Sequence, residues 1–219
     1  MKLRLDLHLH TVFSKDSRIQ LTHAVERAKA LHLDGFAITD HDSVQSHDEI
    51  FRFSRELLII PGIEVSSKDG HILGYGISES IPKGLSAAET IDRIRSSGGA
   101  AVIAHVMRRS NTVREQVIRT LRPHALEVLN SSTLSPIAFP KAQALALDLA
   151  IPQSAGSDAH VIGTMGRAYT IVEAESATDE AVVGAVRNGR IQPEGSRDSF
   201  RNRFTKIGWE IKRRLGRLE

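Results

Sequence analysis

LRLDLHLH, at residues 3–10, alternates apolar and polar side chains as a half-buried β-strand does. Apolar positions then recur at helical spacing over residues 21–33, and the helix is expected to stop at Asp34-Gly35. A strand followed by a helix makes one βα unit. Residues 36–39 and 44–56 predict a second such unit, so the chain opens with a repeating strand and helix pattern.

The same alternation continues along most of the chain. Residues 57–65 and 71–77 predict two paired strands, because Lys68-Asp69-Gly70 between them is typical of a hairpin turn. The remaining expected strands are 100–104, 125–129, 151–155 and 168–172, and the remaining expected helices are 87–97, 112–121, 136–149 and 179–188. Strands that alternate with helices favour a largely parallel sheet, and their number suits closure into an α/β barrel.

Domain organisation follows from a change of composition near residue 190. We expect one barrel domain at residues 1–190 and a separate segment at 191–219, with a linker at 190–196 because Pro193 and Gly195 lie there. Apolar residues recur every three or four positions beyond it, which predicts an amphipathic C-terminal helix. Residues 196–219 hold eight Lys and Arg against three Asp and Glu. The +3 charge of the chain therefore comes from this tail, and the body is no basic nucleic-acid platform.

Composition excludes several other classes of chemistry. The 219 residues contain no cysteine, so disulfides, zinc thiolate sites and cysteine nucleophiles are absent, and any metal must be held by nitrogen and oxygen. The first residues lack the apolar run of a signal peptide, and no stretch reaches the length of a membrane span. We therefore expect a cytoplasmic protein.

Histidines and carboxylates follow the expected strands with unusual regularity. In an α/β barrel the C-terminal ends of the strands meet at one end and carry the chemistry, so these residues should form one cluster. They are His8 and His10, Asp40-His41, Glu64, His71, His105, and Asp158 with His160. His8 and His10 share one face of their strand, and a buried Glu64 would need a cation or several donors.

Some of these residues have simpler interpretations. The Asp40-His41-Asp42 segment could cap the following helix through Asp42 or Ser43, and residues 156–160 could form an ordinary Asx-turn. His23, His32 and His47 lie in or beside expected helices, and His124 stands at the wrong end of its strand, so none is expected to bind metal. Asn130 is expected to be a hydrogen-bond partner of a ligand.

Five ordered motifs resemble the PHP family, named for polymerase and histidinol phosphatase. They are Asp6-Leu7-His8-Leu9-His10-Thr11 with Ser14-Lys15-Asp16, Ile38-Thr39-Asp40-His41-Asp42, Pro61-Gly62-Ile63-Glu64, Ala104-His105, and Gly156-Ser157-Asp158-Ala159-His160. The resemblance spans residues 1–172. It implies a distorted seven-stranded (β/α) barrel, a centre of two or three metal ions and hydrolysis of phosphate esters.

The resemblance also implies a ligand set. His8, His10, Glu64 and Asp158 would form the first site, and Glu64 would be shared with a second site completed by His105 and His71. Asp16, His41 and His160 would form the third site, although some relatives have histidine in place of Asp16. Val106 stands where proline is usual. Among members, the chain is most similar to small stand-alone enzymes that hydrolyse nucleotide phosphates.

The expected cofactors are two or three divalent transition metal ions, Mn²⁺, Zn²⁺ or Fe²⁺, because so many imidazoles disfavour Mg²⁺ and Ca²⁺. A metal-activated water would attack phosphorus, His41 or His160 would protonate the leaving oxygen, and Arg108 would neutralise phosphoryl charge unless adjacent Arg109 does so. The expected substrate is a phosphorylated small molecule or nucleotide.

The basic tail and the chemistry of the site each leave an alternative open. Residues 197–217 could contact an RNA end or an anionic surface, as in an exoribonuclease or a nucleic-acid-binding module, but packing on the barrel is the favoured interpretation. A metal-dependent amidohydrolase would use the same ligands on a different bond.

Overall fold

The computed structural model describes residues 1–53 and 55–196. The basic helix expected in the tail lies outside these residues. Within the described part of the chain, no helix is long and apolar enough to cross a bilayer.

The first strand lies inside the sheet, third from one edge. β1 (Lys2–Leu9) pairs in parallel with β2 (Gly35–Ile38), and helix α1 (Leu21–Ala30) connects the two. On its other edge β1 pairs antiparallel with β8 (Ala168–Glu173). Leu5, Leu7 and Leu9 on one face of β1 are fully buried, and Asp6 and His8 on the other face are buried as well, so both faces of this strand are covered.

A hairpin continues the sheet beyond β2. β3 (Leu58–Ser66) pairs in parallel with β2 and antiparallel with β4 (His71–Tyr75), which confirms the hairpin expected around Lys68-Asp69-Gly70. β4 in turn pairs antiparallel with β5 (Ala100–Ile103). Helix α3 (Ala87–Ser96) lies between β4 and β5 and begins with a capping box formed by Ser86 and Glu89.

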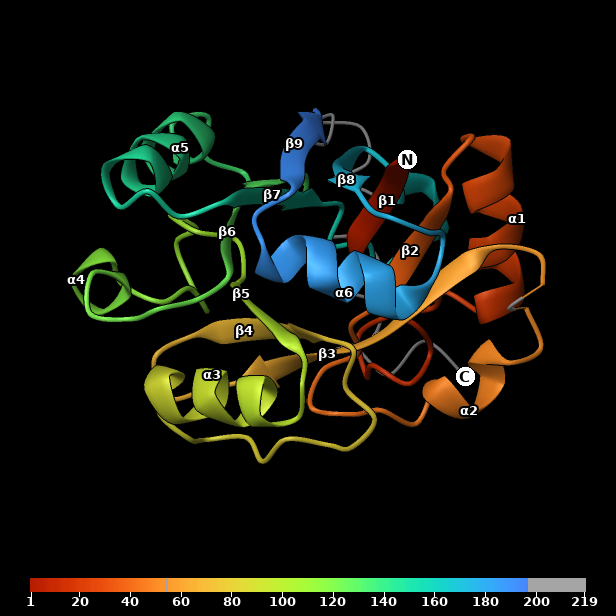
Figure 1. The fold of residues 1–219 in the computed structure, drawn as a ribbon, viewed down its shortest axis with the longest axis horizontal. Coiled ribbons are helices and arrows are strands. Elements are labelled where there is room, and N and C mark those ends of the chain that lie inside the picture. Colours follow the sequence, from red (N-terminus) through yellow and green to blue (C-terminus); the bar gives the residue numbers. More distant parts are fainter. Residues whose placement is uncertain (54, 197–219) are drawn as a thin grey trace, which may run out of the picture.

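The sheet ends on this side with two further strands. β6 (Ala125–Asn130) and β7 (Gln153–Gly156) are parallel to β5 and to each other, with helices α4 (Glu115–Ile118) and α5 (Ala138–Asp148) in the connections. The short 3-10 helix η1 (Ile162–Thr164) follows β7. The strand order is β7-β6-β5-β4-β3-β2-β1-β8-β9 (Figure 1).

The two sides of the sheet approach each other next to β1, so the barrel is nearly closed. The Asp158 N–H donates to the His8 carbonyl at 2.8 Å, and the His10 N–H donates to the Ala159 carbonyl at 3.1 Å. Residues 157–159 therefore join the end of β7 to the end of β1. The distorted α/β barrel predicted from the sequence is confirmed. Four of its eight strand pairs are antiparallel, however, so the sheet is less parallel than expected.

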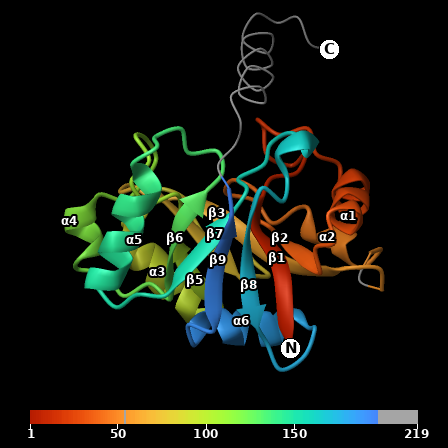
Figure 2. The same ribbon diagram turned by 90° about the horizontal axis from the view of Figure 1, so that it is seen from above.

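The end of the described chain differs from the prediction. Residues 190–196 were expected to be a linker, but β9 (Ile191–Gly195) pairs antiparallel with β8 in an unbroken register. Pro193 is tolerated because β9 is an edge strand. Helix α6 (Asp179–Arg187) precedes it and lies across the end of the barrel where β1 begins (Figure 2), with Val182, Val183 and Val186 buried.

Two expected helices are much shorter than predicted. Where a helix was expected at residues 44–56, the described residues of this stretch form only α2 (His47–Ile50), and none of its residues is buried. A helix without a buried face gains little from packing, and most helical stability in proteins comes from packing. In place of a helix at 112–121, only α4 forms, with Ile118 as its single buried residue.

Candidate metal centre

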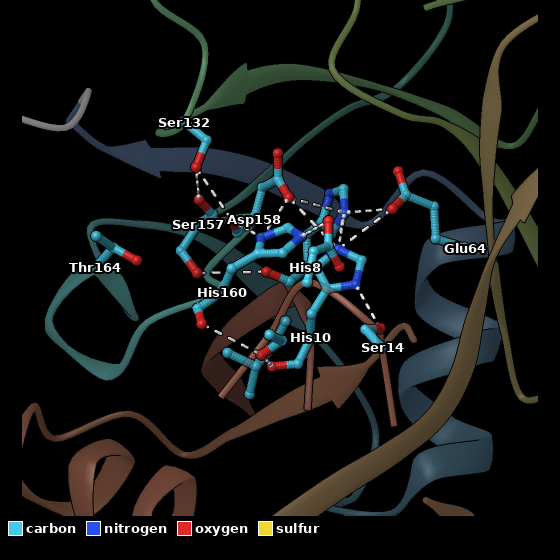
Figure 3. A network of polar contacts seen from close by, with 12 residues as sticks. His8, His10, Ser14, Glu64, Ser132, Ser157, Asp158, His160 and Thr164 are labelled. Carbon is cyan, nitrogen blue, oxygen red and sulfur yellow. Dashed lines mark hydrogen bonds and ion pairs between the residues drawn. The ribbon is translucent and has the colours of Figure 1, made fainter. Parts of the chain in front are cut away.

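The ligand residues predicted from the sequence converge at one end of the barrel. Most come from the C-terminal ends of strands or from the loops that follow them, whereas His71 begins the antiparallel strand β4. Figure 3 shows five of them, His8, His10, Glu64, Asp158 and His160, gathered in one place. The groups of side chains able to hold an ion are His8, His10 and Asp158; His41, Glu64 and His71; and His10, His41 and His160. The strand-end argument thus identified the location of the cluster.

Two histidines of β1 stand at its centre. His8 and His10 are two residues apart on one strand, both are fully buried, and their Nε2 atoms are 3.2 Å apart. Asp158 is directed at the same point from the segment after β7, with its Oδ1 at 3.7 Å from His8 Nε2 and 3.4 Å from His10 Nε2. Asp158 has a φ of +52°, an unfavourable backbone angle that is common at functional sites.

Glu64 on β3 presents its two carboxylate oxygens to different sets of histidines. Oε1 lies 2.9 Å from His71 Nδ1 and 3.0 Å from His105 Nε2. Oε2 lies 3.2 Å from His10 Nε2, 3.5 Å from His8 Nε2 and 3.0 Å from His41 Nδ1. The side chain is 1% exposed. This is the arrangement that a carboxylate shared between two ions requires.

A third group lies toward solvent. Asp16 Oδ2 is 3.2 Å from His160 Nε2 and 3.8 Å from His41 Nε2. The rings of His160 and His41 flank His10, with centroids 4.1 and 4.4 Å from its own. His41 therefore stands between this group and Glu64, with one ring nitrogen toward each. The other oxygen of Asp16, Oδ1, is buried without a hydrogen-bond partner within the described residues.

Burial and charge act against each other on the carboxylates. Burial alone would raise the pKa of Glu64, but the charge of His8 and hydrogen bonds from His10 and His105 lower that pKa well below its usual value. Burial likewise opposes the ionisation of Asp158, and His8, His10 and Arg108 hold its pKa well below the usual value. Both side chains are thus carboxylates that require neighbouring positive charge.

The histidines divide into two kinds. Burial alone would lower the pKa of His10, but hydrogen bonds to Asp158 and Glu64 raise it to about 9. Burial lowers the pKa of His41 to about 4, with a further contribution from the charge of His10, and burial also lowers the pKa of His105. His41 and His105 are therefore neutral imidazoles near pH 7, the form that binds metal.

The residues present fit divalent metal ions. The candidate ligand atoms lie within 4.8 Å of one another in each of the three groups, two of which combine ring nitrogens with a carboxylate oxygen, and buried carboxylates need a cation. Two buried atoms without hydrogen-bond partners among the described residues, Asp16 Oδ1 and His105 Nδ1, also belong to this cluster. Nitrogen and oxygen donors in this mixture suit Mn²⁺, Zn²⁺ or Fe²⁺.

Arg108 reaches the cluster from the loop after β5. Its Nη1 donates to Asp158 Oδ2 at 2.9 Å, and its side chain is 29% exposed. The guanidinium thus faces the cluster on one side and solvent on the other. Arg109 beside it is exposed and makes no such contact with the cluster within the described residues.

Glu127 on β6 was missed by the sequence argument. Its Oε1 lies 2.9 Å from His8 Nδ1, and its Oε2 accepts from the His105 N–H at 2.6 Å. Asn130, expected to be a hydrogen-bond partner of a ligand, donates to Glu127 at 3.0 Å, and Glu127 in turn contacts His8 and His105. The signal was present, because Glu127 is an acidic residue within an apolar strand, as Glu64 is. Asp6 is a second such carboxylate, and burial raises its pKa.

The remaining histidines lie outside the cluster, and the segment after β2 does not cap a helix. His23 and His32 are exposed, His47 Nε2 donates to the Gly62 carbonyl at 2.8 Å, and His124 Nδ1 accepts from the Ala101 N–H. None belongs to the cluster, as expected. The alternative in which Asp42 or Ser43 caps a helix is wrong: Ser46 is the N-cap of α2, and Asp42 Oδ1 accepts from the Ser66 N–H.

Solved structures with a similar fold include a two-domain protein from Bacteroides vulgatus described as containing a predicted PHP-like metal-dependent phosphoesterase. It is 21% identical with a TM-score of 0.74, over 90% of this chain and 65% of that one, so the present chain spans under two thirds of it. Another is the lesion-specific endonuclease EndoQ from Pyrococcus furiosus, 21% identical with a TM-score of 0.65, over 88% of this chain and 58% of that one. These similarities concern the fold alone.

Sequence comparison identifies the family directly. An uncharacterised protein from Methanocaldococcus jannaschii is 33% identical over 115 residues, 47% of this chain and 67% of that protein. The PHP domain matches residues 6–134, which contain His8, His10, Glu64 and His105, and the PHP-associated region matches residues 136–191. With the sequence, the fold and the cluster of histidines and carboxylates in agreement, this chain belongs to the PHP family.

Proposed function

We propose that this protein hydrolyses phosphate esters at a centre of two or three divalent transition metal ions. The observation that carries the proposal is Glu64, whose two buried oxygens each face a separate set of imidazoles. His8, His10 and Asp158 would complete one site, His71 and His105 a second, and Asp16, His41 and His160 a third. When bound, such ions supply a water activated for attack on phosphorus and neutralise phosphoryl charge.

The chain's own residues have distinct roles in this proposal. Arg108 would bind a phosphoryl oxygen through the part of its guanidinium that faces solvent, while Nη1 holds Asp158. His41 or His160 would hold the proton that the leaving oxygen receives, and metal ligation competes with that role. Glu127 accepts a hydrogen bond from His8 Nδ1. The other ring nitrogen of His8, Nε2, therefore faces Glu64 and Asp158.

Nucleotide phosphates are the substrates we propose first. The support is the sequence resemblance to small members of the family that act on nucleotides. An amide substrate is the main rival, since the same donor set can activate water against a carbonyl carbon.

The test combines metal analysis with a substrate panel. Purified protein is analysed for Mn, Zn and Fe, and is then assayed on phosphomonoesters, phosphodiesters and amides, with each metal and after chelation. We expect phosphoester hydrolysis that chelation abolishes and metal restores. Hydrolysis of amides alone, or phosphoester hydrolysis that survives complete removal of metal, would overturn the proposal.

Glu64→Ala is the sharpest single substitution for this test. It removes the carboxylate that five imidazoles share, so we expect loss of bound metal and a fall in activity of at least about 100-fold. Glu26→Ala, on the exposed face of α1, is the matched control and should keep its bound metal and its activity. A Glu64→Ala protein with full metal content would contradict the shared role of Glu64.

A further inference from the structure

A buried hydroxyl lies between two of the proposed metal ligands. Ser14, in the loop that follows β1, is 1% exposed, and Asp40, in the segment that follows β2, is fully buried. The Oγ atom of Ser14 lies 3.2 Å from His10 Nδ1, 3.0 Å from the backbone nitrogen of His41 and 2.7 Å from Asp40 Oδ1. Figure 3 shows the contact between Ser14 and His10. One oxygen atom therefore touches two histidines from different strands.

The three partners of Ser14 determine where its proton points. A hydroxyl has one proton to donate and two lone pairs to accept with. The carboxylate oxygen of Asp40 accepts, so it receives the Ser14 proton, and the His41 N–H can only donate, so it occupies one lone pair. The second lone pair is left for His10 Nδ1, which must therefore donate. The hydrogen-bond network thus assigns a proton to Nδ1 of His10.

Asp40 acts in this network as an acceptor at both of its oxygens. Oδ1 also accepts from the Thr11 N–H at 2.7 Å, and Oδ2 accepts from the Thr11 hydroxyl at 2.7 Å. Asp40 was expected in the metal cluster, but it belongs to none of the three groups of described residues that are able to hold an ion. Its oxygens are instead directed at Thr11 and Ser14, which leaves this buried carboxylate without a role in the proposed reaction so far.

The position of this proton matters for the other ring nitrogen of His10. A neutral imidazole with its proton on Nδ1 has a lone pair on Nε2, and a metal ion binds only the nitrogen that has a lone pair. Nε2 of His10 lies 3.2 Å from Glu64 Oε2 and 3.4 Å from Asp158 Oδ1, at the centre of the cluster. Glu127 has the same effect on His8, but it contacts the ring directly. In His10 a hydroxyl stands between the ring and the carboxylate.

We propose that Ser14 and Asp40 are positioning residues, which keep a proton on Nδ1 of His10 and so hold its Nε2 for a metal ion. The same hydroxyl fixes the backbone of His41, a ligand from the neighbouring strand. The proposal rests on the metal centre of the proposed function, but not on which bond the protein hydrolyses. Because Ser14, Asp40 and His10 are all buried, solvent does not replace a contact that is removed.

The first test measures the affinity of the full-length protein for Zn²⁺ by calorimetry. Ser14→Ala removes the acceptor of His10 Nδ1, and we expect the tightest zinc site to bind at least about tenfold more weakly. Ser17→Ala is the matched control, because the Ser17 hydroxyl is also buried and donates to the backbone carbonyl of His10 at 2.7 Å without touching the ring. We expect it to change the affinity less than about threefold. Equal affinities in Ser14→Ala and Ser17→Ala would overturn the proposal.

Two substitutions of Asp40 separate the direction of the hydrogen bond from simple support of the fold. In Asp40→Ala the Ser14 proton loses its acceptor and can turn toward His10 Nδ1, so we expect at least the loss of zinc affinity seen in Ser14→Ala. Asp40→Asn keeps one accepting oxygen for Ser14 and should bind zinc within about threefold of the wild type. Adding Ser14→Ala to Asp40→Ala should weaken binding less than about twofold further, because both act through one contact. Asn as damaging as Ala, or losses that multiply in the double variant, would contradict the proposal, and the two serine variants remain decisive if Asp40→Ala does not fold.

The proton itself is observed by NMR, which separates this proposal from the proposed function. Long-range proton–nitrogen correlation on protein with isotope-labelled histidine distinguishes a protonated Nδ1 from an unprotonated one, with or without bound Zn²⁺. We expect Nδ1 of His10 to be protonated in the wild type in both states. An unprotonated Nδ1 would overturn the proposal even if phosphate esters were hydrolysed. If no ester is hydrolysed, the proposed function fails, while a protonated Nδ1 and weaker zinc binding in Ser14→Ala still support the roles of Ser14 and Asp40.

Discussion

At the scale of single residues, Glu127 shows how a carboxylate outside the ligand set prepares the cluster. Its contact with Nδ1 of His8 sets which ring nitrogen carries the proton, and its contact with the His105 N–H fixes the backbone of a second histidine. His105 has a φ of +33°, so this backbone needs such support. The same carboxylate therefore orients histidines from two strands.

We expect Glu127→Gln to lower metal affinity about 10- to 100-fold, because the amide can no longer accept at both of its terminal atoms. Metal titration followed by calorimetry measures the change, with Glu26→Gln on the exposed face of α1 as control. An unchanged affinity in Glu127→Gln would mean that the orientation of His8 does not depend on this carboxylate.

Residue types and their spacing predicted that the histidines and carboxylates of the cluster lie together, but not that Glu127 and Asp6 lie beside them. His8 and His10 are recognisable because two histidines at alternate positions of a strand share a face. Glu127 and Asp6 lie within strands as well, but the atoms that satisfy them come from segments distant in sequence, such as the backbone of His105 and of Gly166. Only the folded barrel brings these donors to them.

At the scale of elements, the junction of β7 with β1 depends on the absence of a side chain at Gly156. A Cβ at this position would lie 2.4 Å from His8 Cβ and 2.8 Å from Glu127 Oε1. The space at Gly156 is occupied by β1, whose backbone must approach β7 for Asp158 to meet His8.

Gly156→Ala should therefore destabilise the protein by about 1–3 kcal/mol and weaken metal binding, since β7 and β1 must separate. Denaturant unfolding measures the first effect and metal titration the second. Gly163→Ala in η1 is the matched control, because an added Cβ there meets no atom within 4 Å. If Gly156→Ala matched Gly163→Ala in both measurements, the strands would have enough freedom to accommodate a methyl group.

Local patterns located most strands but misjudged several boundaries. The hairpin of β3 and β4 was predicted from its turn residues, whereas β9 was taken for a linker because it contains Pro193 and Gly195. Pairing with β8 makes Ile191–Gly195 a strand, and pairing between strands is not visible in a local pattern. The short helices α2 and α4 show the opposite error: their sequences have helical periodicity, but few of their residues pack against the core.

At the scale of the whole molecule, a histidine far from the proposed metal centre also has a strongly lowered pKa. His124 lies before β6, outside the cluster. Burial lowers its pKa to about 4, and the charges of Arg95 and Arg187 on α3 and α6 add to the effect. His124 therefore stays neutral in the folded protein at pH values where it is protonated in the unfolded chain, for which the usual pKa is about 6.5.

The sign of the pH effect follows from this difference. Below pH 6.5 the unfolded chain binds a proton at His124 that the folded protein does not bind until about pH 4. Protonation of His124 therefore does not affect the free energy of unfolding above pH 6.5, and it lowers that free energy progressively as the pH falls toward 4. We expect His124→Gln to lose less unfolding free energy than the wild type between pH 7.5 and pH 5.0, measured by denaturant unfolding. An equal loss in both proteins would contradict the depressed pKa.

The direction of β9 has a practical consequence. β9 is antiparallel to β8, which is antiparallel to β1, so β9 runs toward the same end of the barrel as His8 and His10. Met1 lies at the opposite end (Figure 2). An affinity tag or reporter fused before Met1 would sit at the end of the barrel away from His8 and His10, whereas a fusion made directly after Ser196 would begin at the end where these two histidines lie.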